Sequence, residues 1–367
     1  MRDPTVQRRL VMSGMGAAAV AVASPAVASP TVAEAIERRL AGLQGEGRVS
    51  GLHALLVARG KELLLEHYEA GEDEIWGTPL GRVVFRPTVL HDLRSVSKSV
   101  VGLLYGIALA EGKVPPPEAG LYAEFPQYAD LAAQPGRDRL TIAHVLSMTL
   151  GLEWDELSIP YSDPRNSEIQ MVAAPDRFRY ILGLPIVGDP GVKWTYCGGA
   201  TALLGRLIAR GTGEKLLDYA RRVLFEPMGF GPTAWSLDRT GEPQTASGLR
   251  LLPRDLVKVG QLVLAGGAWN GRQLVPAEWM KRITTQSVPI EGRGGYGYHW
   301  YLGSMPAGKL QSAEWVAGIG WGGQRLFVLP KLDVVVAMNL GNYRLPGMEQ
   351  GRIGTAIMIE AVLPSLV

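Results

Sequence analysis

The chain has 367 residues, and its 37 lysines and arginines against 35 aspartates and glutamates give a formal net charge of +2 at pH 7. A charge so close to zero argues against a general nucleic-acid binder, which would carry a basic excess on one face. Hydrophobic residues make up 47% of the chain and charged residues 20%, so the chain can fill a large core and is not globally disordered. The single cysteine, Cys197, excludes an intramolecular disulfide framework and a cysteine-clustered zinc site.

The first 28 residues have the layout of a signal peptide. Arg8 and Arg9 precede a mildly apolar run rich in glycine and alanine, and Ala26-Val27-Ala28 forms a small-x-small cleavage site. The arginine pair resembles a twin-arginine export signal, so we expect an exported protein, cytoplasmic only if the signal is not used. The run is shorter than the roughly 20 apolar residues that cross a membrane, so no stable membrane anchor is expected.

The first part of the mature chain predicts mixed structure. We expect a helix over residues 31–42 and a hairpin whose two apolar runs flank Arg59-Gly60. Residues 72–91 show no periodicity and are predicted to form a loop. From Ser95 to Glu111 apolar residues recur at helical spacing, and Gly112 is the expected end of this helix.

The rest of the chain is rich in helices first and in strands later. Helices are predicted at 141–148, 176–183, 199–211, 214–225, 253–266 and 276–285, strands at 296–303, 313–320, 324–330 and 333–340, and a last helix at about 348–362. Strand-rich ends thus enclose a helix-rich middle. We therefore predict an α/β domain from residues 29–94 and 233–367, with an antiparallel sheet flanked by helices, and an inserted helical domain at 95–232. The cleft between the two domains is the default place for a site.

Several familiar catalytic motifs are missing from the sequence. It contains no G-x-S-x-G nucleophile elbow, no H-E-x-x-H pair, no phosphate-binding loop and no dinucleotide-binding motif. His144 lies on an apolar helix and is interpreted as a structural histidine. We therefore expect no metal and no cofactor.

Ser95 and Lys98 stand at the start of the most strongly periodic helix. Their i, i+3 spacing puts both side chains on one helix face. A serine hydroxyl is a poor nucleophile until a base takes its proton, and a buried lysine can act as that base. The free N–H groups at the helix N-terminus also favour a developing oxyanion. Alone, Ser-x-x-Lys is weak, because a serine at a helix start is usually only an N-cap.

Five segments, the first of which contains Ser95 and Lys98, strengthen this interpretation. In chain order they are HDLRSVSKSVVGLLYGIALAEGKV, LTIAHVLSMTLGLEWDE, PGVKWTYCGGATALLGRLI, ASGLRLLPRDLVKVGQLVLAGGAWNG and GWGGQRLFVLPKLDVVVAMN. Between about residues 50 and 340 the chain resembles the serine β-lactamase and penicillin-binding protein superfamily. The resemblance is to its class C-like branch, which includes esterases, D-amino-acid peptidases and aminohexanoate-oligomer hydrolases.

The resemblance implies roles for three residues. Ser95 would be the acylated nucleophile, Lys98 its proton partner, and Tyr196 a general base acting as a phenolate; a core tyrosine is the alternative for Tyr196. Tyr196 matches the tyrosine of the family's Tyr-x-Asn box, but the third position of that box is Gly198. The amide that helps to hold the lysine and the substrate is therefore missing. Cys197 is interpreted as a small buried apolar residue.

The family's third box, usually Lys/His-Thr/Ser-Gly, is replaced by Trp321-Gly322-Gly323. A backbone N–H of Gly323 or Gln324 would then complete the oxyanion hole with that of Ser95, in an alignment that could slip by one residue. Trp321 offers an apolar face and one N–H donor in place of a cation, which favours a neutral or hydrophobic acyl substrate. Candidates to line the cleft are Tyr161, Trp154 and His299, each with packing as the alternative.

Three functions remain open from the sequence. The first is a serine hydrolase that acts on small carboxylic esters or simple amides through a Ser95 acyl-enzyme. The second is a β-lactamase or D-amino-acid peptidase acting on cell-wall-related substrates, which Gly198 and Trp321 disfavour. The third is a non-catalytic binding protein on the same fold, which the intact Ser95, Lys98 and Tyr196 disfavour. The sequence sets no oligomeric state.

Overall fold

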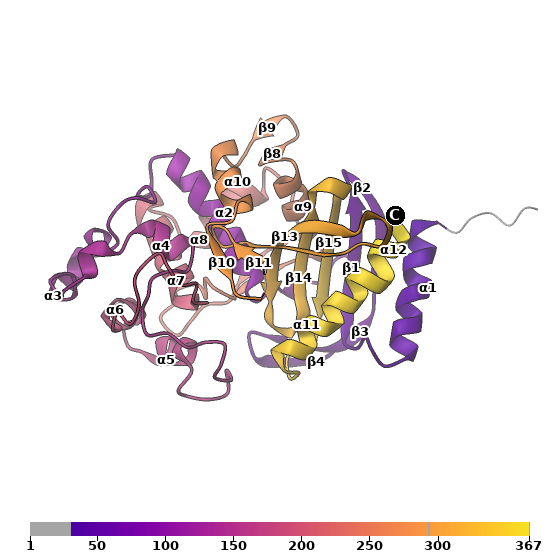
Figure 1. Ribbon diagram of the computed structural model, residues 1–367, viewed down its shortest axis with the longest axis horizontal. Coiled ribbons are helices and arrows are strands. Elements are labelled where there is room, and N and C mark those ends of the chain that lie inside the picture. Colours follow the sequence, from indigo (N-terminus) through magenta and orange to yellow (C-terminus); the bar gives the residue numbers. More distant parts are fainter. Residues whose placement is uncertain (1–30, 293, 367) are drawn as a thin grey trace, which may run out of the picture.

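The computed structural model describes residues 31–366 with the exception of Arg293. The predicted signal peptide, residues 1–28, lies outside the described residues. The centre of the structure is one eight-stranded antiparallel sheet (Figure 1). Its strands, in spatial order, are β10 (Val288–Ile290), β11 (Gly294–Tyr296), β12 (Tyr301–Pro306), β13 (Ser312–Gly320), β14 (Gln324–Leu329), β15 (Val334–Leu340), β1 (Leu52–Arg59) and β2 (Glu62–Tyr68).

Both ends of the chain build this sheet, as the sequence predicts. Strand β1 lies between β15 and β2 and pairs Leu56 with Ala337 on one side and with Glu66 on the other. All residues of β1 except Arg59 are buried, because helices cover both faces of the sheet. A strand buried on both faces explains why its sequence, LHALLVAR, reads as an almost continuous apolar run.

Helices from the two termini cover one face of the sheet (Figure 1). They are α1 (Val32–Gly45), α11 (Gly347–Ala356), its π-helical continuation Ile357–Val362, and α12 (Leu363–Leu366). Helix α1 begins with a capping box, in which the Thr31 side chain accepts from the N–H of Glu34 and the Glu34 carboxylate accepts from the N–H of Thr31. The opposite face carries α9 (Pro253–Leu264) and α2 (Val96–Ala110), which packs on β13.

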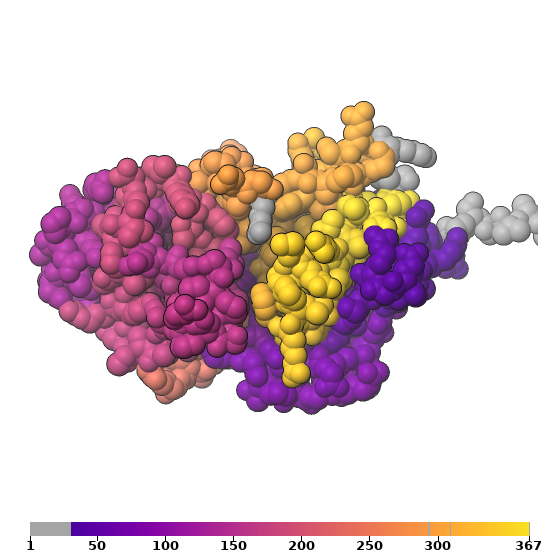
Figure 2. All heavy atoms as spheres, turned by 60° about the horizontal axis from the view of Figure 1, so that its bottom comes forward, coloured from indigo at the N-terminus to yellow at the C-terminus, as the bar shows by residue number. Residues whose placement is uncertain are grey.

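The middle of the chain is helical, as predicted, and packs beside the sheet (Figure 1). Its helices are α3 (Ala129–Ala132), α4 (Ile142–Leu146), α5 (Ser167–Ala173), α6 (Arg177–Gly183), α7 (Gly198–Thr212) and α8 (Leu216–Ala220), while α10 (Ala277–Thr284) follows α9. Helix α2 packs against α7 and against β13, so it joins the two parts. In the space-filling view the helical part, in magenta, meets the indigo and yellow part along a furrow (Figure 2).

The prediction of a loop over residues 72–91 is wrong. The segment contains most of a hairpin, β3 (Ala70–Ile75) and β4 (Thr78–Val84), which turns at Trp76 and Gly77 with φ angles of 45° and 91°. Most residues of β4 are exposed, so neither face of the strand has to be apolar. The sequence therefore lacks the alternation of apolar and polar residues by which a half-buried strand is recognised. The strand predicted at 296–303 is also interrupted, since β11 ends at Tyr296 and β12 begins at Tyr301.

Three smaller pairings complete the fold. Strands β5 (His91–Asp92), β7 (Leu249–Leu251) and β6 (Ala234–Trp235) form a short sheet, and β8 (Ala268–Trp269) pairs with β9 (Arg272–Gln273). The short sheet matters for the site, because β5 leads directly into the start of α2. In the part of the chain that the structure describes, no helix is both long enough and apolar enough to cross a membrane.

Candidate active site

The structure brings Ser95 and Lys98 together at the start of α2. Ser95 is the N-cap residue, and its side chain makes no capping hydrogen bond. The Lys98 ammonium, one turn further on, donates to Ser95 Oγ over 3.1 Å and to the carbonyl of Ala246 over 3.1 Å. Lys98 is 3% exposed, whereas Ser95 is partly open to solvent. A reachable hydroxyl thus lies beside a buried amine, which is the arrangement that a serine nucleophile needs.

Tyr196 joins this pair from the segment that precedes α7. The Lys98 Nζ lies 4.8 Å from the centre of the Tyr196 ring, and the Tyr196 side chain lies close enough to Ser95 for Ser95 to influence its pKa. All three residues that the resemblance implicates therefore meet at one point. Cys197, the next residue, is buried, and burial raises the pKa of its thiol well above the usual range. Cys197 therefore stays a neutral thiol, in agreement with its interpretation as a small apolar residue.

The protonation of Tyr196 differs from the expectation of a phenolate. Burial raises the pKa of Tyr196 well above its usual value, and the nearby Glu156 raises it further. Ser95 lowers this pKa but does not reverse the shift. The resting side chain is therefore a neutral phenol, which can donate a proton or relay one.

Two buried carboxyl groups flank Gly198, and the sequence analysis assigned neither of them. The Glu156 carboxylate accepts from Trp154 Nε1 (3.0 Å), the backbone N–H of Gly198 (2.7 Å) and the Tyr161 hydroxyl (2.9 Å). Glu168, at the start of α5, lies against the opposite side of Gly198. Glu156 falls within one of the five family-like segments and could have been singled out. No local motif marks Glu168.

The third box lies where β13 ends, and Gly320 at this end approaches the backbone nitrogen of Ser95. A Cβ atom built on Gly320 would lie 3.1 Å from the backbone nitrogen of Ser95. Gly323 instead packs against Leu340, and the Gln324 side chain donates to the Leu340 carbonyl over 2.6 Å. The N–H of Gly322 is also engaged, by Gln350 Oε1 at 2.8 Å. None of these contacts involves the N–H of Gly323 or Gln324, so their assignment to the oxyanion hole stays a prediction.

The Trp321 side chain lies on the cleft side of this turn. Its indole N–H donates to the carbonyl of Tyr343 over 2.8 Å, so the expected free donor is already used. Its ring meets the Tyr161 ring edge-on, with 5.4 Å between the ring centres. This contact joins the turn after β13 to the loop that precedes α5. Tyr161 and Trp321 are thus in direct ring contact, and their role as residues that line the cleft stays a prediction.

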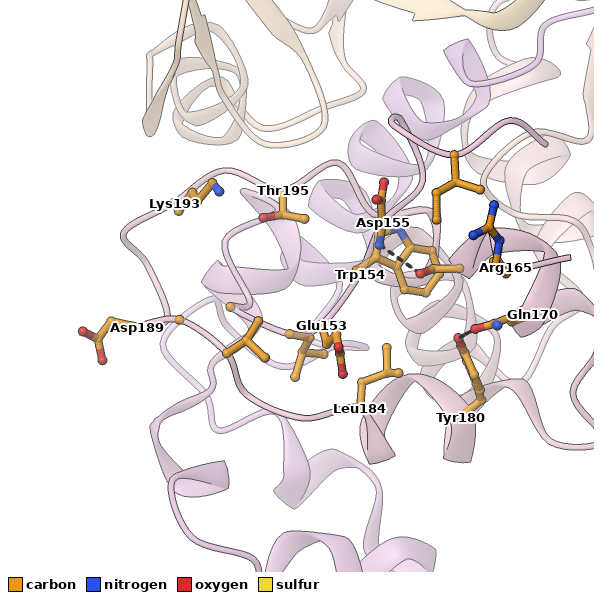
Figure 3. A pocket seen from close by; sticks show the side chains of 16 residues that line it. Glu153, Trp154, Asp155, Arg165, Gln170, Tyr180, Leu184, Asp189, Lys193 and Thr195 are labelled. Atoms are coloured by element: carbon orange, nitrogen blue, oxygen red, sulfur yellow. Dashed lines mark hydrogen bonds between the residues drawn. The ribbon is translucent and has the colours of Figure 1, made fainter. Parts of the chain in front are cut away.

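The other two candidate lining residues, His299 and Trp154, lie in two different surroundings. His299 is buried, with Nδ1 2.9 Å from the Leu146 carbonyl and Nε2 3.0 Å from Thr201 Oγ1, so it is a packing residue. Trp154 lines a cavity of about 630 Å³ on the helical part (Figure 3). That cavity is bounded by the segment before α5 and by Lys193 and Thr195, and it does not include Ser95, Lys98 or Tyr196. His144 accepts at Nδ1 from the N–H of Thr141, which makes it a helix-capping residue.

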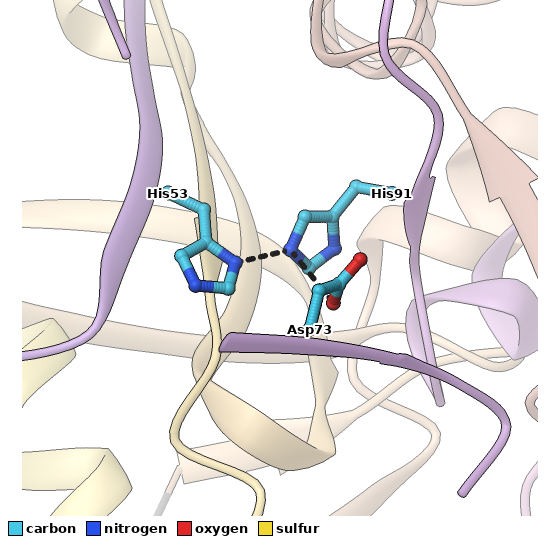
Figure 4. A group of neighbouring side chains, drawn as sticks. All are labelled: His53, Asp73 and His91. Atoms are coloured by element: carbon cyan, nitrogen blue, oxygen red, sulfur yellow. Dashed lines mark hydrogen bonds and ion pairs between the residues drawn. The ribbon is translucent and has the colours of Figure 1, made fainter. Parts of the chain in front are cut away.

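One cluster in the described part of the chain has metal-ligand chemistry. His53, Asp73 and His91 place their ligand atoms within 4.8 Å of one another, and all three are buried (Figure 4). His53 Nδ1 lies 2.9 Å from His91 Nε2, and His91 Nδ1 lies 2.9 Å from the Asp92 carbonyl. That carbonyl can only accept, so His91 carries its proton on Nδ1, and its Nε2 accepts a hydrogen bond from the Nδ1–H of His53. The imidazoles therefore satisfy each other as a neutral pair.

Comparison with known proteins shows which family the chain belongs to. The sequence profile of the beta-lactamase family matches residues 33–352. The 6-aminohexanoate-dimer hydrolase of Paenarthrobacter ureafaciens is 28% identical over 325 residues, which cover 83% of this chain and 76% of that protein. A penicillin-binding protein homologue from Caulobacter crescentus superposes with a TM-score of 0.67 at 18% identity, covering 93% of this chain and 99% of that one. EstCE1, a hydrolase with promiscuous acyltransferase activity, superposes with a TM-score of 0.64 at 15% identity, covering 87% and 98% of the two chains.

The chain belongs to the beta-lactamase family, because the family profile matches most of its length. The two structural likenesses show the serine β-lactamase-like fold, an antiparallel sheet with helices on its faces and a helical part beside it. The relatives include hydrolases, so the protein is an enzyme of that kind.

Proposed function

We propose that the protein hydrolyses small carboxylic esters or simple amides through an acyl-enzyme on Ser95. The observation that carries this proposal is the 3.1 Å contact between Ser95 Oγ and Lys98 Nζ, with the Tyr196 phenol against both side chains. Lys98, once neutral, accepts the hydroxyl proton as Ser95 attacks the substrate carbonyl carbon. The C–O or C–N bond to the leaving group then breaks, and the Tyr196 hydroxyl donates a proton to that group. Lys98 returns its proton to Tyr196.

The second half of the cycle uses the same groups with water. A water molecule loses a proton to Lys98 and attacks the acyl carbon, and Ser95 leaves with a proton as the carboxylic acid product forms. In both halves negative charge develops on the carbonyl oxygen. The backbone N–H of Ser95, at the N-terminus of the 15-residue helix α2, supplies one donor for this oxyanion. The approach of Gly320 to the Ser95 nitrogen supports the N–H of Trp321 as the second donor.

The substrate end of the site supports an ester or simple amide rather than a β-lactam. A β-lactam carries a carboxylate, which needs a cation or several donors once the cleft excludes water. Arg325, the nearest arginine in sequence to the third box, is buried and donates to the carbonyls of Gly320 (2.9 Å) and Gln324 (2.8 Å). Trp321 presents an aromatic face. The similarity to an aminohexanoate-dimer hydrolase supports the amide part of the proposal.

The test is covalent trapping of the nucleophile. We expect a fluorophosphonate to add one label to the wild-type protein, mapped to the peptide that contains Ser95, and none to Ser95→Ala. The matched control is Ser97→Ala on the same helix, because Ser97 Oγ accepts from the N–H of Leu249 and has a structural role. Labelling of Ser95→Ala at the wild-type rate, with loss of labelling in Ser97→Ala, would overturn the assignment.

A further inference from the structure

Glu168 fills the space into which a side chain at position 198 would project. A Cβ atom built on Gly198 would overlap Glu168 Oε2 and lie 2.7 Å from Glu168 Cδ. A side chain at position 198 and the present position of Glu168 therefore exclude each other. The two residues come from different helices, since Glu168 lies in the first turn of α5 and Gly198 begins α7. The carboxyl group thus stands where the third residue of the Tyr-x-Asn box would carry its amide.

One oxygen of the Glu168 carboxyl group has no hydrogen-bond partner among the described residues. This oxygen, Oε2, is buried. The neighbouring Glu156 is the contrast, because its two oxygens accept three hydrogen bonds. An unpaired buried polar atom destabilises a protein by about 1–3 kcal/mol, so its presence beside a catalytic centre calls for a partner that the free enzyme lacks.

The surroundings of Glu168 favour its neutral form. Burial raises the pKa of Glu168 to about 8, and Glu156 adds to this rise, while Lys98 and Arg177 act against it. Other titratable groups also interact electrostatically with Glu168, namely Tyr161, Tyr196 and Cys197. A protonated carboxyl group has one O–H donor and one carbonyl acceptor, which is the hydrogen-bonding capacity of a side-chain amide. Near neutral pH the Glu168 side chain can therefore offer a substrate the same hydrogen-bond donor and acceptor as an asparagine side chain at position 198.

We propose that Glu168 is a substrate-positioning residue, whose side chain hydrogen-bonds a polar group in the acyl part of the substrate from the place that Gly198 leaves open. This inference rests on the proposed Ser95 acyl-enzyme. It also names a substrate class: acyl chains that carry a neutral hydrogen-bond acceptor such as an amide carbonyl. A plain alkyl chain would leave Glu168 Oε2 unpaired, so the enzyme should prefer the acyl chain with the acceptor.

The experiment compares two activated esters on the same preparations. One is p-nitrophenyl butyrate, and the other is the p-nitrophenyl ester of N-acetyl-β-alanine, whose acyl chain carries an amide. We expect the wild-type enzyme to favour the amide-bearing ester in kcat/KM. Glu168→Ala should lower this preference about 10-fold, mainly through KM, because a lost hydrogen bond to a neutral partner is worth about 1 kcal/mol or slightly more. Glu153→Ala is the matched control, since Glu153 is an exposed carboxylate in the segment that precedes α5.

A reciprocal exchange separates positioning from packing. Gly198→Asn alone should lose activity, because its side chain collides with Glu168. The double variant Gly198→Asn/Glu168→Ala should regain part of the preference for the amide-bearing ester, because the amide then occupies the vacated space. The proposal is overturned if Glu168→Ala lowers kcat/KM equally for both esters, or if the double variant is no better than Gly198→Asn.

The pH dependence of the preference for the amide-bearing ester is a second measurement, which a purely structural role of Glu168 would not change. The wild-type preference for the amide-bearing ester should decline above about pH 8, where Glu168 ionises and loses its donor. Glu168→Gln should keep the preference for the amide-bearing ester at pH 7 and should no longer lose it above about pH 8. If Glu168→Gln still loses the preference above about pH 8, the proposal is overturned. This test does not depend on whether Glu168→Ala folds. Fluorophosphonate labelling of Ser95 is measured in parallel. Absence of labelling in the wild-type enzyme would refute the proposed function itself, whereas normal labelling with an unchanged preference would refute only the role of Glu168.

Discussion

Arg94, the residue before the nucleophile, forms an ion pair with Glu74 on the β3–β4 hairpin. The Arg94 backbone has a φ of 48°, a left-handed conformation that residues with side chains rarely adopt. Its guanidinium lies 4.9 Å from the centre of the Tyr343 ring. The hairpin and the end of the sheet therefore hold the turn that presents Ser95. Strain of this kind persists only where surrounding contacts fix it, and it is common beside catalytic groups.

This arrangement predicts different effects from two substitutions of Arg94. Both Arg94→Ala and Arg94→Gly should lower kcat several-fold, because each removes the ion pair with Glu74. Arg94→Gly should nevertheless be about 1 kcal/mol more stable than Arg94→Ala, since glycine adopts a positive φ without strain. Urea unfolding and ester hydrolysis measure the two effects, and Arg82→Ala on the exposed face of the same hairpin is the control. A more stable alanine variant would contradict the role of the backbone conformation.

The role of Tyr196 in proton transfer predicts a large loss from a small change. Tyr196→Phe keeps the ring beside Lys98 and removes only the hydroxyl, so kcat should fall about 10²–10³-fold with little change in KM. Tyr105→Phe on α2 is the matched control, because it removes a buried hydroxyl that donates to the Pro115 carbonyl over 2.8 Å, away from the site. That variant should lose stability and keep its activity. Wild-type kcat in Tyr196→Phe would mean that Lys98 alone transfers the protons.

The absence of a side-chain cation in the third box predicts poor β-lactam hydrolysis. We expect kcat/KM for nitrocefin to be about 100-fold or more below that for p-nitrophenyl butyrate, since an unpaired carboxylate in a closed cleft is costly. Both substrates are measured on one preparation, with Ser95→Ala as the blank. Comparable values would show that another group binds the carboxylate and would return the β-lactamase alternative to first place.

Three buried histidines predict a loss of stability in mild acid. Burial lowers the pKa of His53 and His299 to about 4 and that of His91 to about 3, whereas an unfolded histidine titrates near 6.5. The unfolded state therefore binds more protons, so the free energy of unfolding is greatest above pH 6.5 and decreases as the pH falls towards 4. His67, Glu168 and Asp92 oppose this trend, because the pKa of each is raised: that of His67 by Glu69, and those of Glu168 and Asp92 by burial.

Calorimetry tests this prediction without any substitution. The Tm should fall between pH 6 and pH 5, where the unfolded histidines are largely protonated and their effect exceeds that of the opposing groups. Unfolding at pH 5.5 should also take up protons, which is measured by comparing two buffers of different ionisation enthalpy. A constant Tm over this range would show that the three histidines are protonated in the native state.

Export through the twin-arginine-like signal remains a proposal with its own test. Replacing Arg8 and Arg9 by lysine should retain the precursor inside the cell, because a receptor reads the arginine pair. The exported protein should begin near Ser29, as N-terminal sequencing would show. An intracellular protein that begins at Met1 would contradict the proposal.

The sequence predicted the parts of the fold that apolar patterns determine. Helix α2 is buried along almost its whole length, and β1 and β15 are apolar because both of their faces are covered. The β3–β4 hairpin escaped prediction because it is mostly exposed and follows charge and turn geometry rather than apolar spacing.

The candidate active site likewise contains residues that local sequence patterns predict and residues that only tertiary packing brings together. Ser95 and Lys98 are one helical turn apart, so their proximity follows from local geometry, and the family pattern adds Tyr196. The position of Glu168 depends on how α5 packs against the start of α7, a contact between elements that no local pattern encodes. The approach of Gly320 to the Ser95 nitrogen at the end of β13 depends on how β13 packs against the start of α2, which no local pattern encodes either.

The place of β1 in the sheet bears on how this protein reaches its native state. During synthesis β1 emerges early and can pair at once with β2, but its other neighbour, β15, is among the last segments made. Until then one edge of an almost entirely apolar strand has no partner, and such edges promote aggregation. Closing the sheet also brings together segments that are far apart along the chain, which slows folding. The nascent chain should therefore depend on chaperones, and removal of β15 and the helices after it should leave a product that aggregates rather than a smaller folded domain.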